Sequence, residues 1–217
     1  MTRRVLVINP NSTEAVTAGI DAAVEPLRLE GGPRIDCATL AEGPPGIETQ
    51  AQVDGVVAPL LALIRREAAA AYVVACFSDP GLHAAREVAG GPVFGISECA
   101  MARALSLGER FGILAILPDS VVRHRRYVRS LGLSDRFAAS LPIGRGVTEL
   151  AEGEETFARL LEVAGRLRDD QGADVLILGC AGMAGYREEL ERQTGLPVVE
   201  PTQAATVAAL GAVCLGW

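Results

Sequence analysis

Short apolar runs alternate with longer amphipathic segments along the whole chain. Continuous apolar runs bounded by turn formers are typical of buried strands. They cover residues 4–8, 34–40, 71–75, 92–96, 111–117, 138–143, 174–179 and 196–199. Apolar positions at helical spacing predict helices over 14–24, 53–66, 82–88, 97–107, 121–131, 154–171, 188–194 and 202–210. Regular alternation of strand and helix predicts an α/β fold with parallel sheets and flanking helices.

Three blocks of the first half recur in the second. Residues 92–105 align with 197–210 at an offset of 105, and Cys76 aligns with Cys180 at an offset of 104. The strand at 4–8 aligns roughly with 111–117, and the turn at Asn11 with the turn at Ser120. We therefore predict two similar α/β halves related by a pseudo-twofold, with the active site in the cleft between them. Their expected bounds are 1–107 and 108–217, and the last helix, about 202–217, is a candidate to pack on the first half.

Two predicted strand-to-helix turns carry polar side chains. Residues 9–13 (NPNST) follow the first strand, and residues 118–120 (PDS) follow the strand at 111–117. Ser12 or Thr13 can cap the helix that starts at residue 14. The amides of Asn9 and Asn11 equally offer donors and acceptors to a ligand, because ligands of parallel sheets bind beyond the carboxyl ends of the strands.

Cys76 and Cys180 occupy matching places, each at the end of an apolar run and before a turn that contains glycine. Two thiols on opposite walls of a cleft suit two-base proton transfer, in which a thiolate removes a proton from carbon and a thiol delivers one to the opposite face. A free thiol titrates near ~8.5, so the thiolate needs stabilisation. Backbone N–H groups of residues 77–78 and 181–183 can supply it, and can also bind the enolate oxygen.

Other cysteine chemistry fits the sequence less well. The chain has no compact zinc-ligand motif and no CxxC motif, and Cys37, Cys99 and Cys214 are expected to be small hydrophobic residues. Cysteine–histidine hydrolysis, with His83 or His124 as base, is the serious rival. We expect both histidines to lie on solvated helix faces, as we do the basic run of residues 123–126.

Composition narrows the function further. With 49% hydrophobic and 22% charged residues the chain is typical of a globular protein, and no apolar run reaches the roughly 18 residues of a membrane span. A net charge of −7 disfavours nucleic acid as a partner. All 20 basic residues are arginine, which excludes a pyridoxal phosphate Schiff base. Five irregularly spaced cysteines and no signal peptide lead us to expect a cytoplasmic protein. The absence of GxGxxG and GxxxxGK(S/T) motifs fits chemistry that needs no cofactor and no metal. We also expect a homo-oligomer.

Four segments carry a family resemblance. Residues 8–13 (INPNST), 46–48 (GIE), 76–82 (CFSDPGL) and 179–183 (GCAGM) resemble the hydantoin racemase branch of the aspartate/glutamate racemase superfamily, which includes allantoin racemases. The resemblance implies two Rossmann-like domains and cofactor-independent racemisation by Cys76 and Cys180. It also implies a substrate hydrogen bond from Asn11 and oxyanion-binding turns at Ser78, Gly182 and Met183, with further pocket contacts from Ile47 and Ser120.

The leading hypothesis is a racemase of 5-substituted hydantoins, allantoin included, with two-base proton transfer at C5. A maleate-type cis–trans isomerase and an Asp/Glu-like amino-acid racemase would use the same two cysteines. Arylmalonate decarboxylases resemble the superfamily too, but they normally keep only the later cysteine. A bilobed protein that only binds a small molecule remains the non-enzymatic alternative.

Overall fold

The computed structural model describes residues 3–150 and 153–217; residues 1–2, where the predicted first lobe begins, lie outside them. Its strands form two four-stranded sheets, in the orders β2-β1-β3-β4 and β6-β5-β7-β8, with every neighbouring pair parallel. The first sheet comprises β1 (Arg4–Asn9), β2 (Arg34–Thr39), β3 (Ala71–Val74) and β4 (Val93–Gly95). The second comprises β5 (Phe111–Ala115), β6 (Phe137–Pro142), β7 (Val175–Leu178) and β8 (Val198–Val199). The α/β prediction is confirmed, and the two sheets share one strand order; a pseudo-twofold axis stays a prediction.

Helices connect the parallel strands, as crossovers of this kind require. They are α1 (Glu14–Val24), α2 (Gln50–Gly55), α3 (Val57–Arg66), α4 (Leu82–Val88), α5 (Ile96–Ala104), α6 (Pro118–Ser130), α7 (Gly153–Asp169), α8 (Arg187–Thr194) and α9 (Pro201–Leu215). A 3₁₀ segment, η4 (Ala181–Tyr186), precedes α8. Within the described residues no helix is both long enough and apolar enough to cross a bilayer.

Three local predictions were wrong. The helix expected over 53–66 begins earlier, at Gln50, because Thr49 and Gln52 form a capping box there, and it is divided at Val56 into α2 and α3. Pro118 opens α6 instead of forming a turn, since a proline in the first helical turn gives up an N–H that has no partner there anyway. Thr13 stands at the start of α1 without capping it, because its hydroxyl donates to the Pro45 carbonyl at 2.7 Å.

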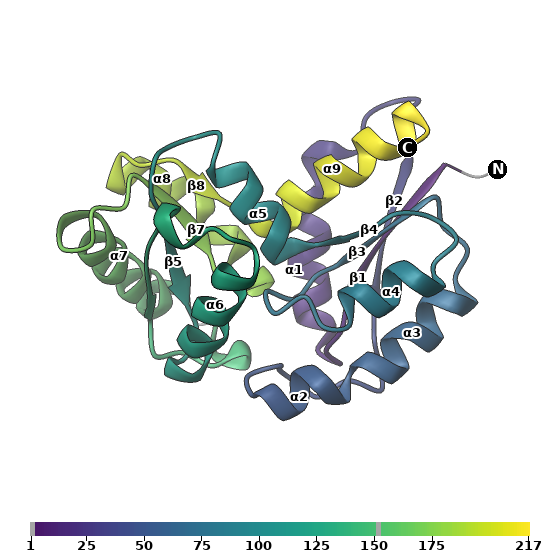
Figure 1. Ribbon diagram of the computed structural model, residues 1–217, viewed down its shortest axis with the longest axis horizontal. Helices are drawn as coiled ribbons and strands as arrows, with labels where there is room; N and C mark the ends of the chain where they lie inside the picture. Colours follow the sequence, from purple (N-terminus) through teal and green to yellow (C-terminus); the bar gives the residue numbers. More distant parts are fainter. Residues whose placement is uncertain (1–2, 151–152) are drawn as a thin grey trace.

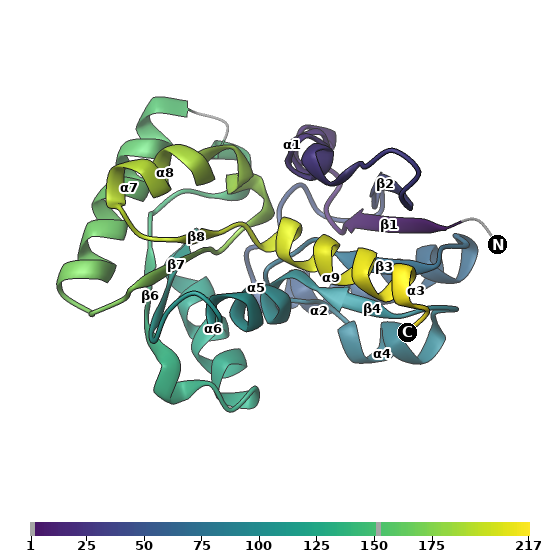
Figure 2. The same cartoon turned by 90° about the horizontal axis from the view of Figure 1, so that it is seen from above.

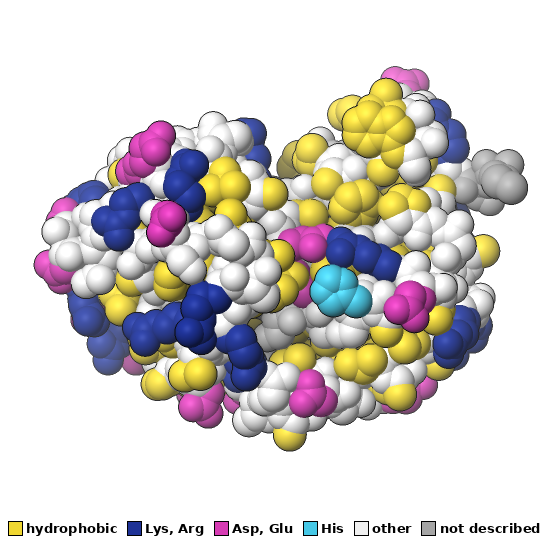
Figure 3. All heavy atoms as spheres, viewed as in Figure 1, with side chains coloured by type: hydrophobic (Ala, Val, Ile, Leu, Met, Phe, Trp, Pro, Cys, Tyr) yellow, Lys and Arg dark blue, Asp and Glu magenta, His cyan; other side chains and the backbone are white. Residues whose placement is uncertain are grey.

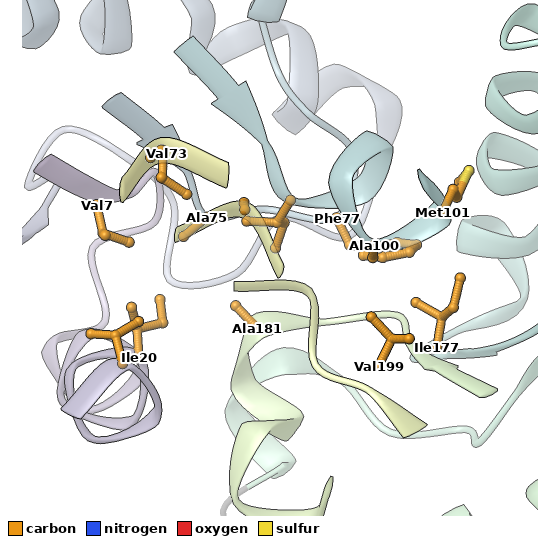
Figure 4. Packing of buried hydrophobic residues seen from close by; sticks show 14 of the residues in the cluster. Val7, Ile20, Val73, Ala75, Phe77, Ala100, Met101, Ile177, Ala181 and Val199 are labelled. Atoms are coloured by element: carbon orange, nitrogen blue, oxygen red, sulfur yellow. The ribbon is translucent and has the colours of Figure 1, made fainter. Parts of the chain in front are cut away.

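The two sheets lie side by side, the first at the right of Figure 1 and the second at the left. On the outer face of the first sheet a hydrophobic cluster contains residues of β1, β3, α3 and α4, and on the second a cluster contains residues of β5, β7, α7 and α8. A third cluster is continuous between the halves: Val7, Val73 and Phe77 belong to it together with Ile177 and Val199 (Figure 4). Because apolar burial is the main favourable term in folding, this shared core holds the halves together.

Helices α5 and α9 cross between the halves. Helix α5 follows β4 but also packs against β7 and β8, whereas α9 follows β8 and packs against β1, β3 and β4. The two helices contact each other, and Figure 2 shows α9 running from β8 to the far end of the first sheet. Each helix buries small residues, Ala100 and Ala104 on α5 and Ala205 and Ala209 on α9, and small side chains allow close packing.

Candidate active site

The carboxyl ends of β1, β3, β5 and β7 open onto one pocket between the halves. Six of the predicted site residues line it: Asn11, Ile47, Cys76, Ser78, Ser120 and Cys180. The other two do not. Met183 is fully buried in the core of the second half, and Gly182 lies behind Cys180 with only its backbone turned toward the thiol. The pocket therefore lies where parallel sheets bind their ligands.

Both thiols are placed by the same local structure. Cys76 follows the end of β3 by two residues, and Cys180 follows the end of β7 by two residues. The Ala75 N–H donates to the Ile8 carbonyl at 2.8 Å, and the Gly179 N–H to the Leu114 carbonyl at 2.9 Å, so the ladders extend to the residue before each thiol. At residue 179 only glycine fits, because a Cβ there would lie 2.4 Å from the Leu114 oxygen.

The environment keeps both thiols largely protonated. Burial raises the pKa of Cys76 to about 12, against the effect of the Ser78 N–H, which donates to the sulfur. Burial likewise raises the pKa of Cys180 to about 11, against the effect of the Gly182 N–H. The charge of an ionised Cys180 further raises the pKa of Cys76, so the pair favours at most one negative charge.

A network of amides fixes the orientation of Asn11. Its Oδ1 accepts from the Thr13 N–H and from Asn9 Nδ2, both at 2.9 Å, while Asn9 Oδ1 accepts from the Asn11 N–H at 3.2 Å. Backbone donors thus determine which side-chain atom of each amide is oxygen. The oxygen of Asn11 is occupied within the turn, and its NH₂ group remains available to donate to a ligand in the pocket.

Asp79 ties the Cys76 loop to the start of α5. Its carboxylate accepts from the Ser97 and Glu98 N–H groups at 2.9 Å each and from the Tyr127 hydroxyl at 3.0 Å. Burial raises the pKa of Asp79 to about 7 despite these three donors. The residue also adopts a positive φ of 42°, the only one among the described non-glycine residues. Its position three residues after Cys76 is held by contacts with α5 of the same half and with Tyr127 of the second half.

Two pocket residues were missed, because the basic run was expected on a solvated helix face. Arg123 and His124 are only 9% and 3% exposed, and both line the pocket. The expectation was wrong for these two residues and right for Arg125, Arg126 and His83, which are exposed. Helical spacing held the missing signal: residues 123 and 124 lie three and four positions after Ser120, and hence on its face of the helix.

His124 is neutral and held in place. Burial, together with the charge of Arg123, lowers its pKa to about 3. The imidazole Nδ1 lies 2.9 Å from Ser140 Oγ, and the ring packs edge-on against Phe77 with centroids 5.1 Å apart. His124 therefore lies in the same pocket as both cysteines, as cysteine–histidine hydrolysis would require. Its Nδ1, however, is already hydrogen-bonded to Ser140.

Hydrogen bonds join the loops of the two halves around the pocket. Glu48 Oε1 accepts from the Val147 N–H at 2.8 Å, and Arg126 donates to Gln50 Oε1 at 2.6 Å. The Tyr127–Asp79 bond is a third such contact. Among residues 3–150 and 153–217 there is no group of three or more His, Cys, Asp or Glu side chains placed to hold a metal ion, and all five cysteines are free.

Comparisons with known proteins match almost the whole chain. The Asp/Glu/Hydantoin racemase family profile matches residues 5–209. A hydantoin racemase of Rhizobium meliloti is 37% identical over 92% of this chain and 84% of its own, and that of Paenarthrobacter aurescens is 34% identical over 99% and 92%. Among solved structures, allantoin racemase from Klebsiella pneumoniae superposes with a TM-score of 0.91 at 33% identity, covering 98% of this chain and 88% of that one. Allantoin racemase from Pseudomonas fluorescens gives 0.93 at 27% identity, covering 98% and 92%.

Proposed function

The chain belongs to the Asp/Glu/Hydantoin racemase family, and from this premise we propose that it interconverts the enantiomers of 5-substituted hydantoins, allantoin included, by proton transfer between Cys76 and Cys180. One observation carries the proposal. The two thiols line the same pocket from equivalent positions in the two halves, and each sulfur accepts a backbone N–H. The racemase activity follows from the family; the two-cysteine mechanism and the substrate are our inference.

In this mechanism one sulfur, as thiolate, removes the C5 proton of the ring. The electron pair of the broken C–H bond moves onto the adjacent ring carbonyl, and the second sulfur, as thiol, returns a proton to the opposite face of C5. The product is the mirror image, and the two sulfurs have exchanged protonation states. A pair that favours one negative charge has the single base and the single acid that each direction requires.

The negative charge on the carbonyl oxygen needs a donor. In the structure the Ser78 and Gly182 N–H groups donate to the sulfurs, as expected for donors that stabilise a thiolate. The free NH₂ group of Asn11 is therefore the donor that we assign to the enolate oxygen.

The charges of the pocket favour a hydantoin over an amino acid. The described part of the lining includes one arginine and no carboxylate side chain. An α-ammonium group would therefore be buried without an acidic partner, which is costly, whereas the hydantoin ring carries no such charge.

Isotope exchange tests the proposal. One enantiomer of a 5-alkylhydantoin is incubated in deuterated buffer with the wild type, Cys76→Ser, Cys180→Ser and the control Cys99→Ser, whose thiol lies outside the pocket. We expect racemisation with deuterium at C5 for the wild type and the control, and loss of racemisation in both pocket variants. Absence of racemisation and of exchange in the wild type, across a panel of hydantoins that includes allantoin, would refute it. Parallel incubations with maleate and with aspartate or glutamate would then identify the activity.

A further inference from the structure

Arg123 is a buried cation beside the two thiols, and the proposed proton transfer does not use it. Its Nη2 donates to Ser120 Oγ at 3.0 Å and its Nη1 to the Asp119 carbonyl at 3.3 Å. Its Nε has no hydrogen-bond partner within the described part of the chain. Both partners are neutral, and a guanidinium remains charged under all ordinary conditions.

Asp119 and Glu48 attract this charge, but neither forms an ion pair with it in the described structure. The described residues contain no carboxylate in an ion pair with Arg123, and none of those that line the pocket is Asp or Glu. Cys76 does not supply the missing charge at rest, because burial keeps its thiol protonated. Burying a charge without a partner is expensive, so a cation held this way in a ligand pocket indicates an anion that arrives with the ligand.

The position of Arg123 indicates which part of the ligand carries that anion. Its side chain lies in the wall between two spaces, the inner pocket that contains both thiols and a neighbouring outer hollow. Phe77, Ser78, Arg123 and His124 line both spaces, and His83 and Arg126 line the outer hollow alone. The inner pocket is narrow, with a cavity volume of about 30 Å³, against about 310 Å³ for the outer hollow. The outer hollow, which Arg123 borders, is therefore the space in which a C5 substituent too long for the inner pocket can lie.

The outer hollow is itself cationic. Arg126 and His83 line it, and its described lining contains no acidic side chain. Figure 3 shows arginine side chains gathered over α6 at the border between the two halves. In a chain with a net charge of −7, a hollow whose charged lining side chains are Arg123 and Arg126 attracts anions toward the pocket.

We propose that Arg123 binds a carboxylate on the C5 substituent, so that the preferred substrates are hydantoins with an acidic side chain. This inference rests on the proposed function, since it names the class of hydantoin that the same site selects. Arg123 is then a specificity-determining residue, whose guanidinium pairs with the carboxylate through charge-assisted hydrogen bonds.

Matched substrates test the inference. The ratio of kcat/KM for 5-(carboxymethyl)hydantoin to that for its neutral isostere 5-(carbamoylmethyl)hydantoin is measured in the wild type, Arg123→Gln, Arg123→Lys and Arg125→Gln. The last variant makes the same charge change at an exposed position of α6 that lines neither the pocket nor the outer hollow. We expect a wild-type ratio well above 1 that falls about ten- to hundredfold in Arg123→Gln, falls less in Arg123→Lys and is retained in Arg125→Gln.

Three results would overturn the inference. The first is a higher kcat/KM of the wild type for the neutral isostere, a result that does not depend on whether any variant folds. The second is an equal loss of both activities in Arg123→Gln, which would make Arg123 the counter-cation of the Cys76 thiolate. The third is a ratio that Arg125→Gln lowers as much as Arg123→Gln does.

A binding titration separates this inference from the proposed function. The dissociation constants of both compounds are measured in the Cys76→Ser/Cys180→Ser protein with and without Arg123→Gln. We expect Arg123→Gln to raise the dissociation constant of 5-(carboxymethyl)hydantoin by a factor at least ten times larger than that for the neutral isostere. If this binding result is obtained but the wild type racemises neither compound, the proposed reaction is rejected and the carboxylate site is retained. Racemisation of both compounds without a charge preference would do the reverse.

Discussion

Gly95 leaves the space that the Asp79 carboxylate occupies. A Cβ at residue 95 would lie 2.3 Å from Asp79 Cγ and 2.4 and 2.7 Å from its two oxygens, far inside contact distance. The backbone of Gly95 has φ −90° and ψ 138°, which alanine adopts without strain. Gly95→Ala therefore changes one thing, the room for a carboxylate that holds three hydrogen bonds.

The expected cost follows from those bonds. A hydrogen bond to a charged group contributes about 1.5–3 kcal/mol, and displacement of Asp79 leaves the Ser97 and Glu98 N–H groups at the start of α5 without their acceptor. Loss of two of the bonds costs about 3–6 kcal/mol, and the more restricted unfolded chain of alanine returns about 0.4–1 kcal/mol. We predict that Gly95→Ala lowers the free energy of unfolding by about 3 kcal/mol, a large share of the 5–15 kcal/mol typical of a domain.

Urea unfolding followed by circular dichroism measures this change. Gly19→Ala is the matched control, because a Cβ there, within α1, meets no atom within 4 Å; it should leave stability unchanged or raise it by about 0.5–1 kcal/mol. Racemase activity of Gly95→Ala should fall as well, since the Ser78 N–H that contacts the Cys76 sulfur is adjacent to Asp79. Equal stability of Gly95→Ala and the wild type would refute the reasoning and mean that the loop after Cys76 relaxes without cost.

Two further predictions concern the reaction. Activity requires one ionised thiol, and because the thiol pKa values of about 12 and about 11 are raised, kcat/KM should increase with pH, by close to tenfold per unit from pH 7 to 9.5; a flat pH–rate profile would contradict the burial of the thiols or their role. Asn11→Asp keeps an oxygen for the Thr13 N–H and Asn9 Nδ2 but removes the free NH₂ donor, so we expect kcat/KM to fall about ten- to hundredfold with little change in melting temperature. Full activity of this variant would exclude Asn11 as the donor to the enolate oxygen.

Periodicity determined most of the fold in advance. The helices expected at 14–24 and 82–88 have the observed bounds, because Val24 and Leu82 each mark a clear change between apolar spacing and turn residues. The repeat of Cys76 at Cys180 located the pocket, since the ends of parallel strands meet at one edge of a sheet. The break at Val56 escaped detection because the apolar spacing continues through it and no capping side chain marks the start of α3.

Charged residues of the site could not be placed from their pattern alone. A basic run on a helix is usually solvated, yet Arg123 is buried because its face of α6 packs toward the other half. That packing depends on contacts such as Tyr127 to Asp79, between residues 48 positions apart in the chain. The sequence contains the two ends of this contact but no local signal that joins them.

The crossing of α5 and α9 means that the chain cannot be divided into two independently folded pieces at residue 107. A fragment ending there would lack α9, which covers the inner face of β1, β3 and β4, and the remaining fragment would lack α5 over β7 and β8. Each fragment would expose an apolar sheet face of the kind that causes aggregation. Because separating the halves would uncover both sheets, we expect a substrate to reach Cys76 and Cys180 without loss of the α5–α9 contact.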